Sequence, residues 1–349
     1  KTYLILPALN LTVSWELLNI YFTQSAGNIE SLDFLWILRD YTSELICYSI
    51  IIKNCKNTKM YSTISHTQIE KNKFSSYLAG LIEGDGTIIV PKSERSPKGV
   101  LNYPSIQIVF HLKDLPLALL IQKNLGHGSL ARKKGVNAYI LTVNNKLGLL
   151  LLLSLINGYM RTPKIYALWK LIDWYNIKDS NLNLEKKPLN TSNLTSDAWL
   201  SGFVEADGHF SVRTTKNDKS TRIECKFELS QRQIDHNGKS NLYFLENIAE
   251  LLSTVVKPVR VDKPNPEYRV RTTNLKGNLN LESYLNNYPL FGSKYLDFKC
   301  WIEVVDLFKS GKMDHKLNIE KVIKIKSNMN DKRTIFVWDH LNNFYNLDK

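Results

Sequence analysis

From about residue 73 onward, helical spacing of apolar positions alternates with short β-branched runs, as in a chain that mixes helices with hairpins. The helix predicted over 115–125 stops at Gly126, a residue that often ends helices. The helix over 163–176 begins with a proline, which the first turn tolerates. The predicted elements of this part are a helix over 73–84, strands at 87–90 and 105–112, a helix over 115–125, strands at 129–132 and 139–143, and helices over 146–157 and 163–176.

The next part of the chain repeats this order. Both parts read as helix, hairpin, helix, hairpin and closing helices, an αββαββα unit that occurs twice. Antiparallel hairpins with separate helices indicate the α+β class. The predicted elements are strands at 209–215 and 222–231, a helix over 242–253, strands at 256–262 and 268–273, and helices over 279–287, 294–309 and 316–328.

A nine-residue motif heads each repeat. LAGLIEGDG runs from Leu78 to Gly86, and LSGFVEADG runs from Leu200 to Gly208. The two motif aspartates lie 122 positions apart (207 minus 85), which is too long for a solenoid unit and fits a duplicated domain. The predicted divisions are an N-terminal extension at 1–70, a first domain at 71–178, a linker at 179–197, a second domain at 198–310 and a helical tail at 311–349.

The motifs predict two helices in close contact. Residues four apart share a helix face, so Gly80 lies above Gly84 and Gly202 above Ala206. Such small-residue faces allow two helices to approach closely. We therefore expect the motif helices to pack against each other at a pseudo-twofold axis, between the two domains.

This packing brings Asp85 and Asp207 together at two helix C-termini, where an acid is unfavourable. A cation between the two carboxylates resolves the conflict, and oxygen ligands suit a hard divalent ion such as Mg²⁺. Beside a phosphodiester, such an ion can activate water and stabilise the leaving oxygen. The competing interpretation is a helix stop followed by an Asp-Gly turn. Two copies in matched context favour the metal site.

The predicted strands carry polar side chains on one face. A two-stranded ribbon with an outward polar face fits the major groove of DNA, where arginine and glutamine read base edges and loop lysines suit phosphates. An ordinary solvated face is the alternative for any single strand. The candidate DNA-binding residues are Lys92, Lys98, Gln107, His111, Lys133, Lys134, Arg213, Lys216, Arg222, Lys226, Arg269 and Arg271.

Charge and composition support a nucleic-acid partner. The 349 residues are 43% hydrophobic, which indicates a globular chain, and carry a formal charge of +13 with a pI near 9.3. Such a surplus favours a polyanion, with nucleic acid ahead of an anionic membrane surface. No apolar run approaches the roughly 20 residues that a membrane span needs. The four cysteines form no Cys-x-x-Cys pair, so we expect reduced side chains and no zinc site.

The two motifs resemble the signature of the LAGLIDADG homing endonucleases and group I intron maturases. The resemblance covers about residues 70–310 and extends to NGYMRTPKI (157–165) and YPLFGSK (288–294), which resemble the closing segments of single-chain members encoded in fungal mitochondrial introns. It implies a saddle of two antiparallel sheets astride double-stranded DNA and cleavage of both strands. Residues 1–70 lie outside the resemblance, and we hypothesise that they derive from an upstream exon.

The resemblance also assigns roles to single residues. It implies that Asp85 and Asp207 are the catalytic acids and that the carbonyl groups of Gly84 and Ala206 are backbone metal ligands. Gln231 matches a polar residue near the family's active site, whereas the first half places Leu112 near the corresponding position. A basic residue that polarises the phosphate falls, in this chain, at either Asn145 or Lys146 in the first half and at either Asn274 or Lys276 in the second.

Two functions follow from the resemblance. The first is a site-specific, Mg²⁺-dependent DNA endonuclease of intron homing, acting as a monomer. The second is a maturase that binds group I intron RNA and assists its splicing. Both aspartates are present, which favours nuclease activity. Frequent asparagine, lysine, isoleucine and tyrosine, encoded by AT-rich codons, agree with an organellar gene and a protein of the mitochondrial matrix.

Overall fold

The computed structural model describes residues 59–216, 221–311 and 316–345, with side chains from residue 68 onward except that of Lys216. The chain divides into two compact units, residues 1–64 and 65–349, and both motifs lie in the second. The predicted extension at 1–70 falls outside the described residues apart from the start of the first motif helix. Within the described part, no helix has the length and apolar character to cross a bilayer.

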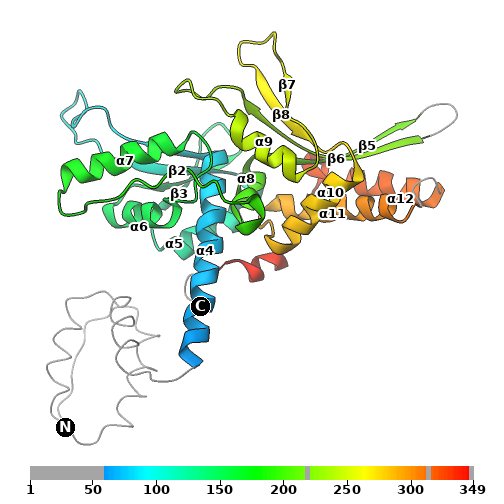
Figure 1. Ribbon diagram of the computed structural model, residues 1–349, viewed down its shortest axis with the longest axis horizontal. Coiled ribbons are helices and arrows are strands. Elements are labelled where there is room, and N and C mark those ends of the chain that lie inside the picture. Colours follow the sequence, from blue (N-terminus) through cyan, green and yellow to red (C-terminus); the bar gives the residue numbers. More distant parts are fainter. Residues whose placement is uncertain (1–58, 217–220, 312–315, 346–349) are drawn as a thin grey trace, which may run out of the picture. The chain divides into compact units, whose positions relative to one another are not determined.

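The first repeat follows the predicted order, with two helices closing it (Figure 1). Helix α5 spans the predicted residues, and Gly126 adopts a left-handed φ of 64° after it. The first motif helix starts upstream of the predicted residue 73. The elements are α4 (Lys59–Asp85), β1 (Gly86–Ile89), β2 (Ser105–His111), η1 (Leu112–Asp114), α5 (Leu115–Leu125), β3 (Ser129–Arg132), β4 (Ala138–Val143), α6 (Lys146–Ile156) and α7 (Ile165–Lys178).

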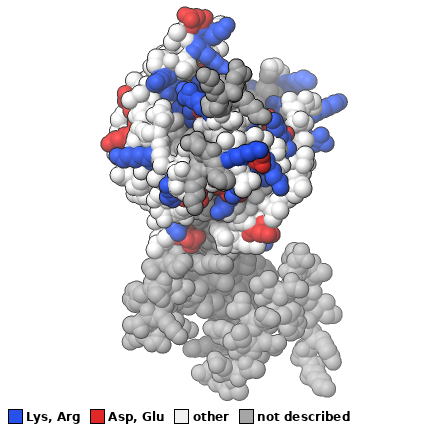
Figure 2. Space-filling model, turned by 90° about the vertical axis from the view of Figure 1, so that its right-hand side faces the viewer, with Lys and Arg blue, Asp and Glu red and all other residues white. Residues whose placement is uncertain are grey.

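The second repeat has the same order. The strand predicted at 256–262 is shorter than expected, because Arg260 adopts a left-handed φ of 54° and ends it. Lysine and arginine side chains are spread over the face seen from the right of Figure 1 (Figure 2). The elements are η2 (Leu194–Ser196), α8 (Trp199–Asp207), β5 (Gly208–Lys216), β6 (Thr221–Arg232), α9 (Leu242–Leu251), β7 (Lys257–Val259), β8 (Glu267–Arg271), α10 (Leu275–Asn287) and α11 (Ser293–Lys309).

Each repeat contains one four-stranded antiparallel sheet, with the orders β1-β2-β4-β3 and β5-β6-β8-β7. The strands of the two sheets pair in the same register. The motif glycine Gly86 pairs with Ile108, and its counterpart Gly208 pairs with Leu229. Two residues further on, Phe110 pairs with Tyr139, and Gln231 pairs with Tyr268. Phe110, and not Leu112, is therefore the counterpart of Gln231.

The inner face of each sheet lies against helices. In the first repeat, α5 packs on β2, β3 and β4, and in the second, α11 packs on β5 and β6. Strand β6 shows the alternation expected for such a sheet, because Phe227 and Leu229 are buried while Arg222 is exposed. This alternation leaves the opposite face polar.

The motif helices α4 and α8 pack against each other through glycines. A Cβ atom on Gly80 would lie 2.8 Å from the backbone nitrogen of Phe203, and one on Gly202 would lie 2.9 Å from that of Leu81. No side chain fits in this space, so the backbones are in direct contact. This confirms the close helix pair predicted from the two motifs.

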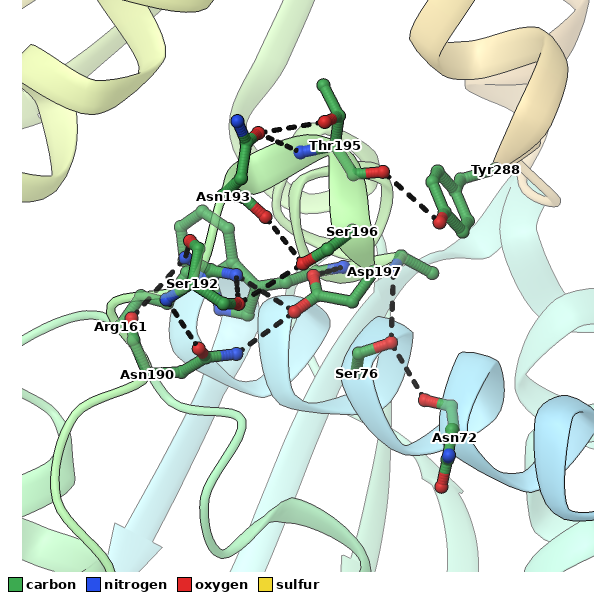
Figure 3. A network of polar contacts seen from close by, with 12 residues as sticks. Asn72, Ser76, Arg161, Asn190, Ser192, Asn193, Thr195, Ser196, Asp197 and Tyr288 are labelled. Atoms are coloured by element: carbon green, nitrogen blue, oxygen red, sulfur yellow. Dashed lines mark hydrogen bonds and ion pairs between the residues drawn. The ribbon is translucent and has the colours of Figure 1, made fainter.

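The linker between the repeats is fastened to both of them (Figure 3). The buried guanidinium of Arg161 donates to the carbonyl oxygen and hydroxyl of Ser192 and forms a 2.8 Å ion pair with Asp197. Asp197 in turn accepts from the backbone nitrogen of Trp199 at the start of α8, and the hydroxyl of Ser76 on α4 accepts from the nitrogen of Ala198. The linker thus holds the start of α8 against α4.

The tail returns to the same interface. Helix α12 (Lys316–Ser327) packs on β5 and α11, and two short 3-10 turns follow it, η3 (Asn330–Lys332) and η4 (Asp339–Asn343). The final aromatic rings of Phe344 and Tyr345 then pack edge-on against Phe291, with centroids at 4.7 and 5.1 Å. The same two rings also pack against Tyr77 of α4, so the tail covers part of the first motif helix instead of projecting from the second repeat.

We expect Gly80→Ala to destabilise the chain. The added methyl group would meet the backbone of Trp199 and Phe203, which cannot move without separating α4 from α8. Overpacking of this kind costs about 1 to 3 kcal/mol, and it should lower the Tm measured by calorimetry. Ser154→Ala on the exposed face of α6 is the matched control. A wild-type Tm in Gly80→Ala would contradict the backbone contact.

Candidate active site

The C-terminal ends of α4 and α8 meet at the base of the interface. A Cβ atom on Gly84 would collide with the Cβ of Ala206 and would lie 3.0 Å from Oδ2 of Asp207. Each helix ends at its motif aspartate. The structure thus places Asp85 and Asp207 side by side, with two helix C-termini that each carry partial negative charge.

The two carboxylates are held at raised pKa values. Loss of hydration and then the charge of Asp207 raise the pKa of Asp85 to about 6, while Lys294 and Lys164 oppose the change. Loss of hydration also raises the pKa of Asp207. Asp85 keeps an exposed side chain, so solvent screens part of this repulsion. The two carboxylates therefore leave excess negative charge at the helix ends, which a bound cation would neutralise.

Two lysine side chains from other segments contact the C-terminal ends of the motif helices. The ammonium group of Lys164 donates to the carbonyl oxygens of Ile82 (2.9 Å), Gly84 (3.3 Å) and Gly86 (2.7 Å). The ammonium group of Lys294 donates to those of Val204 (3.1 Å) and Ala206 (2.8 Å). Burial lowers the pKa of both lysines, and the nearby acids raise it. Both ammonium groups thus offset the negative ends of the helices.

The sequence prediction missed these two lysines, although a signal was present. The segments 157–165 and 288–294 lead into the last helix of each repeat. One segment has a lysine just before α7, and the other has a lysine in the first turn of α11. A comparison of the two closing segments, in the way that the motifs were compared, would have singled out Lys164 and Lys294.

The motif glutamates hold the turns that carry the lysines. The buried carboxylate of Glu83 accepts from the backbone nitrogens of Arg161 (3.0 Å) and Thr162 (2.6 Å) and from the indole nitrogen of Trp199. Glu205 accepts from the nitrogens of Phe291 (2.7 Å) and Gly292 (3.0 Å). Glu83 and Glu205 therefore have a supporting role, in contrast to the aspartates two residues later.

Gln231 contacts the acid pair directly. Its side-chain nitrogen donates a 2.8 Å hydrogen bond to Oδ2 of Asp207 and lowers the pKa of that carboxyl against the effect of burial. Among the described residues of the first repeat, no donor takes this place, since Phe110 occupies it.

Comparison with known proteins agrees with this geometry. The sequence pattern of the LAGLIDADG endonuclease family matches residues 78–175 and 200–305, a region that covers both repeats and their motifs. The chain belongs to the LAGLIDADG endonuclease family. Each match contains one complete repeat, so the duplication seen in the sequence is a duplication of the family domain.

Several relatives of this LAGLIDADG endonuclease are proteins named as intron-encoded. The chain is 32% identical to the intron-encoded DNA endonuclease aI3 of Saccharomyces cerevisiae, over 84% of its own length and 78% of that protein. It is also 34% identical to the intron-encoded RNA maturase bI4 of the same yeast, over 46% of its own length and 23% of the maturase.

Solved structures share the fold. The I-SmaMI LAGLIDADG homing endonuclease, bound to cleaved DNA, matches 74% of this chain and 98% of its own with a TM-score of 0.61 at 19% identity. The I-LtrWI LAGLIDADG homing endonuclease, bound to target DNA, matches 76% and 100% with a TM-score of 0.61 at 20% identity. These likenesses confirm the predicted α+β fold with two antiparallel sheets.

The predicted basic residues of the active site lie elsewhere. Asn145 and Asn274 cap α6 and α10 by accepting from the backbone nitrogens of Gly148 and Gly277. Lys146 forms a 2.8 Å ion pair with Asp179, and Lys276 is exposed on α10. Among the described side chains, the cations that act on the acid pair are Lys164 and Lys294.

The predicted DNA-binding residues occupy the outer face and the loops. Lys92, Lys98, Lys133 and Lys134 are exposed in the loops of the first sheet, and the side chain of Lys216 falls outside the described part.

Several outward cations have partners within the sheets. Glu224 lies 2.6 Å from Lys226 and 3.0 Å from Arg222, and its charge also interacts with Arg213. Two further arginines contact β6: Arg269 donates to the hydroxyl of Ser230, and Arg271 lies 4.0 Å from Glu228. Such partners hold the arginine side chains in place on the sheet.

The two remaining candidates lie on β2. Gln107 is partly buried between its neighbours Thr87 and Thr142, and the exposed His111 accepts from the backbone nitrogen of Lys113 through its Nδ1. His111 is therefore more accessible to a ligand than Gln107.

The residues at the helix ends fit a hard divalent ion. Within the described part of the chain, no cluster of three or more histidine, cysteine or acidic side chains is arranged for a metal. The site offers two carboxylates, and the carbonyl oxygens of Gly84 and Ala206 already accept from the lysines. Mg²⁺ suits such a set, because it is usually bound by one or two carboxylates together with waters and substrate phosphates.

We expect Glu83→Gln to destabilise the chain. The groups around its carboxylate are donors, so the amide nitrogen of glutamine would face other donors without an acceptor. The unfolding free energy should fall by about 1 to 3 kcal/mol in denaturant titration. Glu250→Gln on the exposed face of α9 should leave it unchanged. Equal stability of the two variants would show that the turn does not depend on Glu83.

The pKa of Asp85 predicts a pH effect on stability without metal. The folded chain, with a pKa of about 6, binds this proton more tightly than the unfolded chain, at about 3.9. The resulting stability is complete below about pH 4 and is lost as the pH rises through about 6. Calorimetry in EDTA should therefore show a Tm gain of Asp85→Asn over wild type that grows between pH 4 and pH 7. A gain that is independent of pH would contradict the shift.

Proposed function

We propose that this LAGLIDADG endonuclease cleaves double-stranded DNA at a specific site in intron homing. The observation that carries the proposal is the adjacency of Asp85 and Asp207 at two helix ends whose repulsion lysines only partly offset. Support also comes from the named endonuclease that the chain resembles at 32% identity and from solved relatives bound to DNA.

In the proposed reaction, the oxygen of a water molecule attacks a backbone phosphorus, and a phosphorus–oxygen ester bond breaks to leave a phosphate end and a hydroxyl end. Asp85 and Asp207 would hold the divalent cation that accompanies the phosphate. Gln231 orients the carboxylate of Asp207. Lys164 and Lys294 balance the charge of the helix ends and so keep the acids close together.

We propose Mg²⁺ as the cofactor, held by the two aspartates. When bound, such an ion activates water and stabilises the leaving oxygen. The carbonyl groups of Gly84 and Ala206 are within the proposed site, and their second lone pairs are open to a ligand beside the lysine contacts.

The two repeats each present a sheet to half of the DNA target in this proposal. Residues 71–178 and 198–310 form the two DNA-binding domains, residues 179–197 connect them, and the tail at 311–349 braces the interface. The outward arginines of β6 and β8 would read bases in the major groove. The loop lysines would contact phosphates, so binding should weaken steeply with salt.

The names of the relatives support a setting for the proposed activity. They are named as intron-encoded, and one is named for a cox1 intron. We propose a protein of the mitochondrial matrix that acts as a monomer, since its two motifs supply both acids.

A second candidate function is assistance to RNA splicing. The 34% identity to an RNA maturase over 46% of this chain favours it. In that case the partner is the group I intron RNA, and the acid pair is not needed. Splicing assays of the host intron with Asp85→Asn and Asp207→Asn separate the two functions: splicing that survives both substitutions supports the maturase.

We expect Asp85→Asn or Asp207→Asn to abolish cleavage of the joined-exon duplex in Mg²⁺ while binding persists. Each substitution removes one of the two carboxylates for the cation and leaves the sheets intact. Cleavage is followed by gel electrophoresis and binding by fluorescence anisotropy at several salt concentrations. Asp179→Asn, whose carboxylate contacts Lys146 and the backbone nitrogen of Asn181, is the matched control. Full cleavage by either motif variant would refute the proposed site.

A further inference from the structure

The segment that leads into α11 is held by carboxylates of both repeats. Glu205 on α8 accepts from the backbone nitrogens of Phe291 (2.7 Å) and Gly292 (3.0 Å). The next nitrogen, that of Ser293, donates at 2.6 Å to Oδ1 of Asp114, a residue of η1 in the first repeat. The start of α11 is therefore fastened by a side chain from the opposite repeat.

Both carboxylates lie close to the backbone of this segment. A Cβ atom on Gly292 would lie 2.5 Å from Oε1 of Glu205 and 3.1 Å from Oδ1 of Asp114, so a larger residue would displace both acids. Asp114 and Lys294 also line the same cavity of about 300 Å³, which adjoins Asp85. Burial lowers the pKa of Lys294, and the surrounding acids, Asp114 among them, raise it. Asp114 thus acts on the segment and on the ammonium group that the segment carries.

The corresponding segment of the first repeat is held differently. Glu83 accepts from the backbone nitrogens of Arg161 and Thr162, in the way that Glu205 holds its own segment. The third position is Pro163, which has no backbone N–H and whose ring fixes φ just before α7. A proline ring thus restricts the chain where the second repeat uses a hydrogen bond.

The counterpart of Asp114 in the second repeat holds its own loop. Asp235 occupies that place, since it follows Gln231 by the same four positions that separate Asp114 from Phe110 (235 minus 231, 114 minus 110). Its carboxylate accepts from two backbone nitrogens of the loop, at 2.8 Å each. Within the described part of the chain, only Asp114 of this pair accepts from a helix start of the other repeat.

We propose that Asp114 is a positioning residue that fixes Lys294 on the end of α8 from the opposite repeat. This rests on the proposed endonuclease function and adds to it a dependence of one repeat's charge balance on the other. The hydrogen bond from Ser293 sets where α11 begins, and the ammonium group of the next residue then reaches the carbonyl oxygens of Val204 and Ala206. A charge that is held in place before the reaction needs no reorganisation when the phosphate arrives.

Cleavage by single variants tests the hydrogen bond. Asp114→Ala removes the acceptor, so the single-turnover cleavage rate in Mg²⁺ should fall roughly tenfold. Affinity for the joined-exon duplex, measured by fluorescence anisotropy, should not weaken. Asp114→Asn retains an oxygen acceptor and should restore most of the rate, which a requirement for the charge alone would not allow. Asp235→Ala, at the counterpart position, is the matched control and should cleave at the wild-type rate.

A rescue experiment copies the arrangement of the first repeat. Ser293→Pro places a proline at the first position of α11, where a missing N–H is tolerated. The double variant Asp114→Ala/Ser293→Pro should therefore recover the rate that Asp114→Ala loses. A general structural defect would not be cured by the removal of a second hydrogen-bonding group.

Crystal structures of the same variants give a readout that does not require cleavage. In Asp114→Ala, Nζ of Lys294 should leave the carbonyl oxygen of Ala206, and in the double variant it should return to it. If Asp114→Ala does not fold in calorimetry, Asp114→Asn and the double variant decide the matter, since both should keep this contact.

Three outcomes would overturn the inference: an unmoved Lys294 in Asp114→Ala, a rate of Asp114→Asn as low as that of Asp114→Ala, or a double variant that does not recover the contact and the rate. A folded wild-type chain that cuts neither strand would instead overturn the endonuclease function, and the position of Lys294 in the crystals would still test the role of Asp114.

Discussion

The contact between α4 and α8 is the constraint on which the site depends. Two helices that touch through the backbone at Gly80 and Gly202 have their C-termini side by side, and each terminus ends at an aspartate. Such an arrangement concentrates negative charge at one point of a basic protein. The lysines on the helix ends, the glutamates that hold their turns and the glutamine on Asp207 can all be understood as responses to that concentration.

The two acids within each motif serve different purposes. The buried carboxylate of Glu83 on α4 accepts hydrogen bonds from the turn before α7, so its negative charge is compensated inside the protein. Asp85, two residues later, has an exposed side chain and accepts no hydrogen bond from the described residues, so its charge remains available to a ligand. Helix geometry explains this division, since residues two apart point to different sides of a helix. The linker and the tail then fix the interface from outside, through Arg161 and Phe344.

The repeat made most of the fold predictable from the sequence. Helix α5, the hairpins and the glycine contact follow from local periodicity and from the comparison of two motifs. Residues that reach the site through long-range packing were harder to predict. Lys164 lies 79 positions after Asp85 (164 minus 85), and nothing local shows that its chain folds back to Gly86. The counterpart of Gln231 was misplaced at Leu112, because strand pairing and not sequence spacing sets the register, and the structure puts Phe110 there. Asn145 and Asn274 were candidates for the site, yet both are helix caps.

The central claim is that Asp85 and Asp207 form one shared cation site at the joined helix ends. Anomalous diffraction from crystals of the chain with its joined-exon duplex and Mn²⁺ tests it most directly, because manganese prefers the same oxygen ligands as Mg²⁺ and can be located by its own signal. The account predicts anomalous peaks within about 2.1 to 2.3 Å of carboxylate oxygens of both aspartates. Peaks that lie only on other residues, with both aspartates left without metal, would contradict it.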